Sequence, residues 1–210
     1  MAVITITRQY GAGGSAVAKL VAGALDWTLI DNQFGGEVAE RAGLPVETVA
    51  AREERAPSLM ERLVRALATA SPETFVPAAA TGDEPDEEAM VRTAERVIAE
   101  AAAHGRAVMV GRGAQAVLAR ASAQDALHAY IVAPRDGRVR EVMARLGLTE
   151  HEAARTLDQT DAARDRYVER HYGLHRQDPA RYHLVLNTGF LGHEGAADLI
   201  VSAARRHGWA

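Results

Sequence analysis

Residues 3–22 read VITITRQYGAGGSAVAKLVA, and this stretch decides the fold. Its opening β-branched run favours a strand. Gly11, Gly13 and Gly14 then let the backbone pass close to a ligand. The apolar residues that follow recur at helical spacing, so the stretch predicts a strand, a glycine-rich loop and a helix. Because the N–H groups and the dipole at a helix start both favour negative charge, we expect the loop to bind an anion.

Two classes of binding site use a glycine-rich loop of this kind. The segment GAGGSA at residues 11–16 fits the dinucleotide pattern G-x-G-x-x-A, and Asp31, twenty residues after Gly11, lies where a ribose-binding acid could sit. However, residues 8–10 (RQY) separate the strand from the first glycine, whereas the dinucleotide turn begins almost at the strand end. The longer loop favours a phosphate-binding P-loop. A glycine-rich turn with no chemical role is the third alternative.

The P-loop pattern G-x-x-x-x-G-K-[ST] matches this loop only in part. Aligned to the sequence, it puts Gly13 at the second glycine and Ser15 at the hydroxyl position. Arg8 then stands at the first glycine and Gly14 at the lysine, so the loop lacks its usual cation. Lys19, the only lysine in the chain, comes four residues after Ser15, about 6 Å farther along the helix axis, and is expected to point away.

Arg8 is the residue that we expect to replace the missing lysine in catalysis. It stands where the strand gives way to the loop, at the carboxyl end of the sheet, where ligands gather. Its planar guanidinium can hold two phosphate oxygens, and charge that develops on the β- and γ-phosphates requires a nearby cation. The alternative is that Arg8 pairs with an acid such as Asp31 and only fixes the loop.

The composition favours one large cytoplasmic domain that acts on small molecules. The chain has 210 residues, of which 48% are hydrophobic, and this is enough for a core. It contains no cysteine, which agrees with a reducing compartment, and neither a signal peptide nor an apolar run of about twenty residues is present. The net charge of −4 offers no general attraction to nucleic acid. We therefore expect neither a nucleic acid nor a membrane as partner, and the oligomeric state stays open.

Short apolar runs alternate with helical patterns along the chain, which is typical of a parallel, doubly wound α/β sheet. Five strands are predicted, at residues 3–7, 28–30, 107–110, 127–132 and 182–186. After the first helix, with a turn at residues 23–27, further helices are predicted at 87–103, 114–120, 135–146, 149–172 and 194–207. In such a sheet we expect ligands to bind outside the carboxyl ends of the strands.

Residues 34–88 interrupt this alternation. Short helices are predicted at 34–42, at 45–55 and after Pro57, and together they form a helical flap. The helical period is lost between residues 71 and 88, where prolines and acidic residues gather. We interpret this part as a mobile loop with a solvated acidic face rather than a metal site, because it has no fixed ligand spacing.

The long helix predicted at residues 149–172 carries Asp158, Asp161 and Arg164 at successive i+3 steps, followed by Arg166. This spacing puts the first three side chains on nearly one face of the helix. One interpretation is a solvated face with intrahelical ion pairs, each worth about 0.2–0.5 kcal/mol. The other is a lid, in which acids hold arginines in place and the arginines reach the transferring phosphates.

Arg112 lies between two glycines, directly after the predicted strand at residues 107–110. An arginine in this position is poorly placed to cover the core with its stem, so the pattern favours an anion contact, with a surface ion pair as the alternative. The eight histidines show no metal-ligand spacing, and we expect most of them to be surface or cap residues.

Five segments together resemble the cytidylate kinase-like family, a branch of the P-loop nucleoside monophosphate kinases. ITRQYGAGGSAVAK resembles its lysine-free phosphate loop, TLIDNQ its acceptor-nucleotide segment and VGRGAQAVL its phosphate-binding arginine turn. LDQTDAARDRY resembles its D-x-x-D-x-x-R lid, and YHLVLNTGFLGHEGAADLI its C-terminal strand and helix. No single segment is specific, but five in the right order over nearly the whole chain are.

The resemblance implies a P-loop NTPase-type three-layer α/β fold with a five-stranded parallel sheet. It implies a single domain over residues 1–210, with a helical acceptor flap at 34–88 and a lid region with its helix at 149–178. The implied reaction is phosphoryl transfer from ATP, with Mg2+, to a pyrimidine nucleoside monophosphate such as CMP or dCMP.

The resemblance also assigns site residues by position. The donor nucleotide would be held by Gly11, Ala12, Gly13, Gly14 and Ser15, with the Ser15 hydroxyl near Mg2+. The acceptor would be engaged by Asp31, Arg112 and Asp158. Catalysis would be served by Arg8 and, from the lid, by Asp161, Arg164 and Arg166.

Two departures from better-known monophosphate kinases keep two rival functions open. Gly14 stands where their lysine is, and Leu157 stands where many lids have another arginine. The first rival is a nucleotide-binding switch or pseudokinase, which the missing lysine favours. The second is a dinucleotide-dependent oxidoreductase, which the pattern G-x-G-x-x-A and Asp31 favour, although it leaves Arg112 and the lid unexplained.

Overall fold

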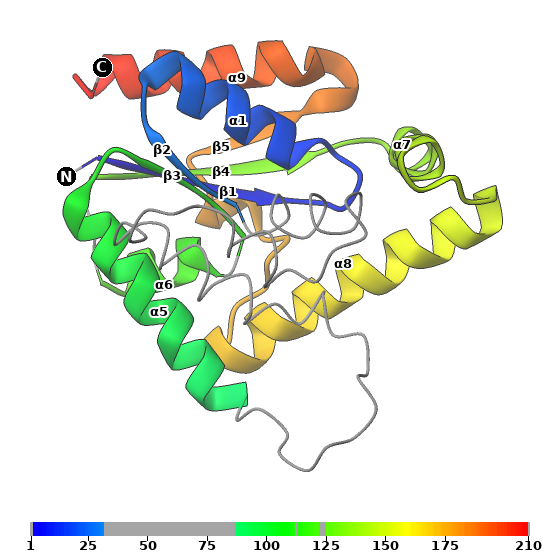
Figure 1. Cartoon of the computed structure of the whole chain (residues 1–210), viewed down its shortest axis with the longest axis horizontal. Coiled ribbons are helices and arrows are strands. Elements are labelled where there is room, and N and C mark those ends of the chain that lie inside the picture. The colour runs from blue at the N-terminus through cyan, green and yellow to red at the C-terminus, as the bar shows by residue number, and fades with distance from the viewer. Residues whose placement is uncertain (1, 32–86, 112, 122–124, 210) are drawn as a thin grey trace, which may run out of the picture.

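The computed structural model describes residues 2–31, 87–111, 113–121 and 125–209. Its strands form one parallel sheet in the order β2-β3-β1-β4-β5 (Figure 1). The strands are β1 (Val3–Arg8), β2 (Thr28–Asp31), β3 (Ala107–Val110), β4 (Ala126–Val132) and β5 (Leu184–Asn187). The predicted α/β fold with a five-stranded parallel sheet is therefore confirmed, and each predicted strand agrees within two residues at its ends.

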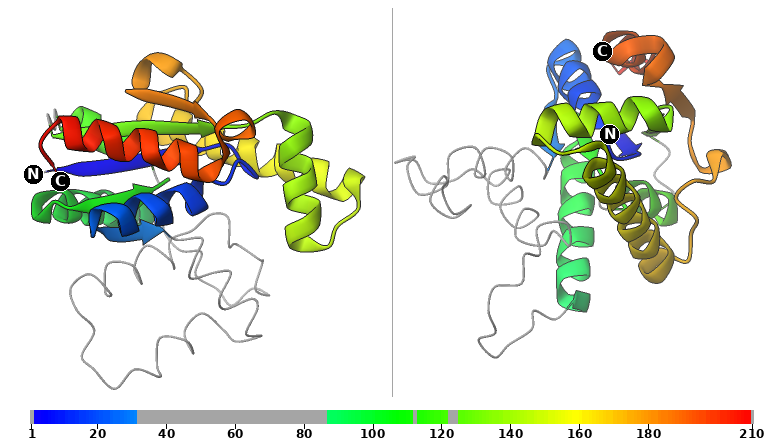
Figure 2. Two further views of the ribbon diagram at one scale, coloured as in Figure 1. Left: turned by 90° about the horizontal axis from the view of Figure 1, so that it is seen from above. Right: turned by 90° about the vertical axis from the view of Figure 1, so that its right-hand side faces the viewer.

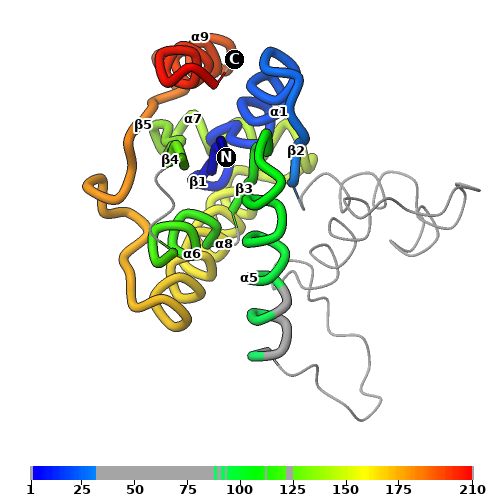
Figure 3. Tube along the Cα trace, turned by 90° about the vertical axis from the view of Figure 1, so that its left-hand side faces the viewer, coloured from blue at the N-terminus to red at the C-terminus, as the bar shows by residue number. Residues whose placement is uncertain are grey.

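Helices cover both faces of this sheet. They are α1 (Gly14–Leu25), α5 (Glu87–His104), α6 (Ala114–Arg120), α7 (Arg135–Leu146), α8 (Glu150–Tyr172), the short 3-10 helix η2 (Pro179–Arg181) and α9 (Thr188–Arg206). α1 and α9 lie on one face, and α5, α6 and α8 lie on the other (Figure 1 and Figure 3). α7 and α8 project beyond the carboxyl end of β4 (Figure 2). The result is the expected three-layer arrangement, with α7 and α8 beside the edge where ligands bind.

The face of the sheet toward α1 and α9 is apolar. Ile4 and Ile6 of β1 are fully buried there, and they pack in one cluster with Val17 and Val21 of α1 and Ile200 of α9. Burial of each such side chain contributes about 1.5–3 kcal/mol. This cluster fixes α1, and therefore the loop that precedes it, against the sheet.

The opposite face of the sheet carries polar side chains on β1 and β4. The hydroxyl of Thr5 lies 2.7 Å from Nδ1 of His128, and both side chains are buried. The ring of His183 stacks on His128 with 5.0 Å between centroids. Burial, with a smaller effect of the neighbouring His183, lowers the pKa of His128 to about 4, so the folded protein holds this ring neutral at pH 7.

Two helices differ from the prediction. α1 continues through Gly23 to Leu25, where a turn had been expected. Burial of Leu25 in the core outweighs the glycine penalty of about 0.5–1 kcal/mol. α9 begins at Thr188, six residues before the predicted start. Gly192, with φ 68° and ψ 177°, interrupts it, so the predicted helix matches the uninterrupted part that follows this glycine.

The strand order contradicts the dinucleotide-binding alternative. In that fold the first strand lies between the second and the fourth, whereas here β1 lies between β3 and β4. The predicted flap up to residue 86, as well as Arg112, falls outside the described residues. Among the helices that the structure describes, none is both long and apolar enough to cross a membrane.

Candidate functional site

The predicted phosphate loop connects β1 to α1 at the carboxyl end of the sheet (Figure 1). β1 ends at Arg8, and α1 begins at Gly14 after Gly13, whose left-handed φ of 75° places it at the helix cap. Gly11 has the same φ of 75°. Residues that carry a side chain rarely adopt this backbone conformation, so the turn requires glycine at both positions. The first N–H groups of a helix have no partner within it, and the loop geometry therefore suits an anion.

Arg8 occupies the space that a side chain at the lysine position would need. A methyl group built on Gly14 would lie 2.5 Å from Cβ and 2.7 Å from Cγ of Arg8. The Arg8 side chain is buried, and its guanidinium runs on to the end of β3, where Nη1 packs against Gly111. The absence of a lysine at position 14 and the burial of Arg8 therefore have one steric cause.

Charged side chains hold the first part of the loop. We name residues 8–10 the upstream half and residues 11–14 the glycine half. The Tyr10 N–H donates to Asp161 Oδ1 at 2.9 Å, and Arg138 Nη1 donates to Asp161 Oδ2 at 2.7 Å. Arg138 also donates to the Tyr10 carbonyl at 3.2 Å. The side chains of Arg138 and Asp161 are 9% and 16% exposed, so water screens this pair less than a surface pair.

Arg176 completes this network from the connection between α8 and β5, which Figure 3 shows in orange beside α6 and β5. Its Nη1 donates to the Arg8 carbonyl at 2.7 Å, and its Nε donates to Asp165 Oδ1 at 2.6 Å. Nη2 lies 3.4 Å from Asp161 Oδ1. The Arg176 side chain is 4% exposed. This guanidinium therefore ties the end of β1 to α8 through one planar group.

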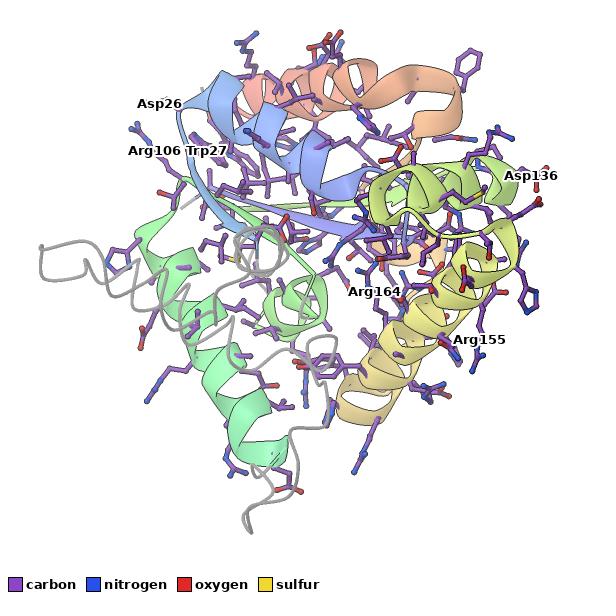
Figure 4. The ribbon with its side chains drawn as sticks, turned by 45° about the vertical axis from the view of Figure 1, so that its right-hand side comes forward. Asp26, Trp27, Arg106, Asp136, Arg155 and Arg164 are labelled. Atoms are coloured by element: carbon purple, nitrogen blue, oxygen red, sulfur yellow. The ribbon has the colours of Figure 1, made fainter. Side chains whose placement is uncertain are left out.

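Arg164 reaches the same half of the loop from α8. Its side chain is buried, Nη1 lies 3.5 Å from the Arg8 carbonyl, and the guanidinium carbon lies 5.4 Å from the centroid of the Tyr10 ring. Figure 4 shows Arg164 on the inner side of α8 and Arg155 farther along the helix on its outer side. Asp161 had been expected to hold an arginine of its own helix, and the arginine contacts described for it are with Arg138 and Arg176.

The structure separates the remaining predicted lid residues from the loop. Asp158 is exposed and forms a 2.8 Å ion pair with Arg135, whose side chain is also about half exposed. Arg166 is exposed on α8. Although the three residues share i+3 spacing, Asp161 and Arg164 face the loop and Asp158 lies on the solvated side. The ion pair of Asp158 agrees with the solvated-face interpretation, and its predicted substrate contact stays a prediction.

Asp31, the predicted acceptor-binding acid, is buried at the carboxyl end of β2. It pairs in register with Val110 of β3, the residue before Gly111. The guanidinium of Arg8 packs against Gly111, so Arg8 and Asp31 approach the same strand end from opposite sides. Arg112, which the sequence placed at this point, lies outside the described residues.

The glycine half of the loop is held by packing and by one hydroxyl. Thr188, at the start of α9, donates to the Ala12 carbonyl at 2.8 Å and to the Val132 carbonyl at 3.2 Å. A methyl group on Gly11 would lie 2.8 Å from the carbonyl oxygen of Arg138. The imidazole of His193 packs against Gly13. α9 and α7 thus border this half of the loop directly.

Sequence reasoning missed several residues around the loop, and they are Arg138, Asp165, Arg176, Thr188 and His193. They come from α7, α8, α9 and the connection before β5, far from the loop in sequence. The sequence had placed Arg138 only within the helix predicted at residues 135–146. No spacing rule marked any of them, because the packing of whole helices brings four of them to the loop and brings Asp165 to Arg176.

Ser15, the residue predicted to approach Mg2+, directly follows the glycine half of the loop. Ser15 lies in the first turn of α1 and is partly buried. Among the residues that the structure describes, no group of three or more acidic or histidine side chains is arranged as a metal site. A P-loop binds Mg2+ through one hydroxyl, one aspartate and the nucleotide phosphates, so its ion does not need three such side chains.

Comparison with solved structures shows the fold. A protein described as uncharacterized, from Eubacterium ventriosum, superimposes with a TM-score of 0.68 at 19% identity, over 98% of this chain and 99% of that one. A shikimate kinase from Bacteroides thetaiotaomicron superimposes with a TM-score of 0.52 at 13% identity, over 97% and 98% of the two chains. One from Acinetobacter baumannii, in complex with shikimate, gives 0.51 at 14% identity, over 99% and 94%. The chain therefore has the P-loop kinase-type fold.

Comparison with known sequences finds one protein that matches over part of its length and one family. A Corynebacterium glutamicum protein named uronate isomerase is 35% identical over 120 residues, which is 56% of this chain. The match covers 22% of that protein, so the chain spans only about a fifth of its length. The family described as cytidylate kinase-like matches residues 3–189, nearly the whole chain. The protein therefore belongs to the cytidylate kinase-like family.

Proposed function

We propose that the protein transfers a phosphoryl group from ATP, with Mg2+, to a pyrimidine nucleoside monophosphate, with CMP or dCMP as acceptor. Membership of a kinase-like family and the P-loop kinase-type fold support ATP-dependent phosphoryl transfer as the general activity. One observation carries the proposal. The phosphate loop has two left-handed glycines at the N-terminus of α1 and lies beside the buried arginines 8, 138, 164 and 176.

The donor side of the proposal uses the glycine half and the first turn of α1. Backbone N–H groups of residues 11–15 would bind the ATP phosphates, as the loop geometry and the helix dipole favour. The Ser15 hydroxyl would hold Mg2+, which would supply positive charge to the site. The N–H groups suit phosphate oxygens, and the hydroxyl oxygen suits Mg2+, because this hard cation prefers oxygen ligands.

Positive charge for the transfer step would come from Arg8 and Arg164. The aliphatic stem of Arg8 fills the space next to Gly14, and its guanidinium lies against Gly111 at the end of β3. Arg164 lies at the upstream half of the loop with its charge 5.4 Å from the Tyr10 ring. Fixed guanidinium groups stabilise the charge that develops on the transferred phosphoryl group. Asp161 would position this region through Arg138, Arg176 and the Tyr10 amide.

The acceptor side of the proposal rests on Asp31 and Arg112. Asp31 is buried at the strand end that Arg8 also reaches, where an acceptor would face the loop. Asp158 and Arg166 are exposed on α8, and their predicted roles toward the acceptor and in the lid stay part of the proposal. The pyrimidine preference comes from the family resemblance alone.

Coupled measurement of ADP release tests this proposal. The panel contains CMP, dCMP, UMP, dTMP, AMP and GMP with Mg-ATP, and it includes shikimate and a uronate because related proteins carry those names. We expect turnover with CMP or dCMP well above ATP hydrolysis without acceptor. Turnover of a sugar acid or of shikimate in their place would keep the phosphoryl transfer and replace the acceptor.

The second candidate is a nucleotide-binding switch without efficient turnover. The steric exclusion of a lysine at position 14 favours it, because Arg8 must then supply all the charge that a P-loop lysine provides. Binding of Mg-ATP with no ADP release above background for any acceptor would establish this candidate in place of the kinase.

A further inference from the structure

His193 lies directly against the glycine half of the phosphate loop. It follows Gly192, whose φ of 68° and ψ of 177° interrupt α9. A methyl group built on Gly13 would collide with Nε2 of His193 and would lie 2.5 Å from Cδ2 and 2.9 Å from Cε1. The imidazole therefore meets the loop with its edge, and Nε2 is the ring atom closest to the helix cap.

The start of α9 is anchored to the same loop. Thr188 is buried, and its hydroxyl donates to the carbonyl of Ala12 at 2.8 Å. Four residues later the break at Gly192 redirects the chain, so His193 stands over Gly13, the residue next to Ala12. Its position is thus determined by one side-chain hydrogen bond and one backbone break, and His193 itself is exposed.

The position of His193 Nε2 beside Gly13 would place it near a phosphate bound in the loop. Glycine in a phosphate loop allows the phosphate to approach the backbone where a Cβ would otherwise stand. An imidazole N–H can donate a hydrogen bond to a phosphate oxygen. Within the described part of the chain, no hydrogen bond or ion pair engages the His193 ring.

The glycine half of the loop lacks the side-chain donor that a P-loop lysine would supply. Gly14 has no side chain, and the Arg8 guanidinium runs to Gly111 at the end of β3. Arg138 and Arg176 bond to Asp161 and to the carbonyls of the upstream half. We propose that His193 is a phosphate-binding residue of this site, and that its Nε2–H donates to a phosphate oxygen of the donor nucleotide beside Gly13. This role rests on the proposed function, because it requires a nucleotide in the loop.

Titration calorimetry on the full chain tests this role with two probes, Mg-ADP and magnesium pyrophosphate. Wild type is compared with His193→Ala, with His193→Lys, which keeps an N–H donor, and with His151→Ala as the control. His151 is an exposed histidine in the first turn of α8 and contacts no part of the loop among the described residues. Melting temperatures of all variants verify that they are folded.

We expect His193→Ala to weaken both probes about tenfold, as the loss of a hydrogen bond to a charged group does. His193→Lys should recover part of this loss, and His151→Ala should bind as wild type does. Unchanged binding of both probes by His193→Ala would overturn the proposal. Weaker binding of Mg-ADP alone would overturn it too, since the ring would then contact the nucleoside, and tighter binding would mean that the ring blocks the loop.

The proposed function fails in a different and recognisable way. If wild type itself binds neither Mg-ADP nor magnesium pyrophosphate, the loop is not a phosphate site, and the role of His193 is overturned with it. If wild type binds both probes and the His193 variants match it, only the role of His193 is lost.

Discussion

The two halves of the phosphate loop are held in different ways. In the upstream half, backbone groups of Arg8 and Tyr10 bond to Asp161, Arg138 and Arg176, which are largely buried and come from α7, α8 and the connection before β5. In the glycine half, packing dominates, and the principal tether is a neutral hydroxyl that bonds to the Ala12 carbonyl. Charged groups thus set the path of the chain before the turn, while packing and one hydroxyl hold the turn itself.

This difference has a consequence for variants of the two halves. A buried ion network loses much free energy when one member is removed, because the others are left without their counter-charge. A packed turn is instead sensitive to added volume. Removal of charge should therefore be the more damaging change upstream, and addition of a single carbon should be the more damaging change among the glycines.

Asp161→Ala gives the largest expected effect, because it breaks the upstream network at its centre. The variant leaves Arg138, Arg176 and the Tyr10 N–H without their shared acceptor, and loss of one partner of a buried pair costs about 3 kcal/mol or more. The measurement is the free energy of unfolding in urea. Asp158→Ala is the matched control on the same helix, and it should change stability little because its pair with Arg135 is exposed. Equal losses in the two variants would remove the distinction between the buried and the exposed acid.

Gly14→Ala tests the packing of the glycine half. Its new Cβ would lie 2.5 Å from Cβ of Arg8, and overpacking of this kind costs about 1–3 kcal/mol. In the Arg8→Gly background the collision disappears, so the double-mutant cycle should show a coupling of at least about 1 kcal/mol. Gly23→Ala is the control on the same helix, where nothing lies within 4 Å, and it should stabilise the protein by about 0.5–1 kcal/mol. Additive effects at positions 8 and 14 would refute the steric explanation for the missing lysine.

Arg164→Ala examines whether the upstream half has a catalytic side chain in addition to structural ones. If Arg164 stabilises charge that develops in the transition state, kcat should fall about tenfold, or about 1.4 kcal/mol, with a smaller change in ATP affinity. Arg155→Ala, on the outer side of α8, is the control and should keep wild-type rates (Figure 4). A parallel loss of ATP affinity without a separate change in kcat would make Arg164 a binding clamp.

The smallest expected effect is the change in stability with pH that comes from His128, a buried neutral histidine of β4. The folded-state pKa of His128 is about 4, below its ordinary value of 6.5, so the unfolded chain binds more protons between these values. The stability that depends on neutral His128 is therefore fully present above pH 6.5, and it is lost as the pH falls toward 4. Between pH 7 and pH 5.5 the unfolding free energy should drop by about 1 kcal/mol. His128→Gln should remove this part of the pH dependence, whereas His151→Gln should leave it.

Local patterns were sufficient for the elements and for the loop. α8 is an example, because the Thr149 and Glu152 capping box and Gly173 with φ 65° bound it where the sequence predicted. The glycines of the phosphate loop were also found by pattern, since a left-handed turn can be formed by few other residues. Both signals involve neighbours in the chain, so no knowledge of the packing is needed to interpret them.

The surroundings of the loop were decided by the tertiary structure. Arg176 bonds to the carbonyl of Arg8 across 168 positions, and Arg138 bonds to that of Tyr10 across 128. Asp158 and Asp161 have the same spacing pattern, yet only Asp161 faces the loop, because the packing of α8 against α7 determines which side of the helix is buried. The sequence by itself determined the sheet, the helices and a phosphate loop without lysine. Only the packing of distant helices decided which charges hold that loop, because contacts between remote side chains depend on the orientation of whole elements.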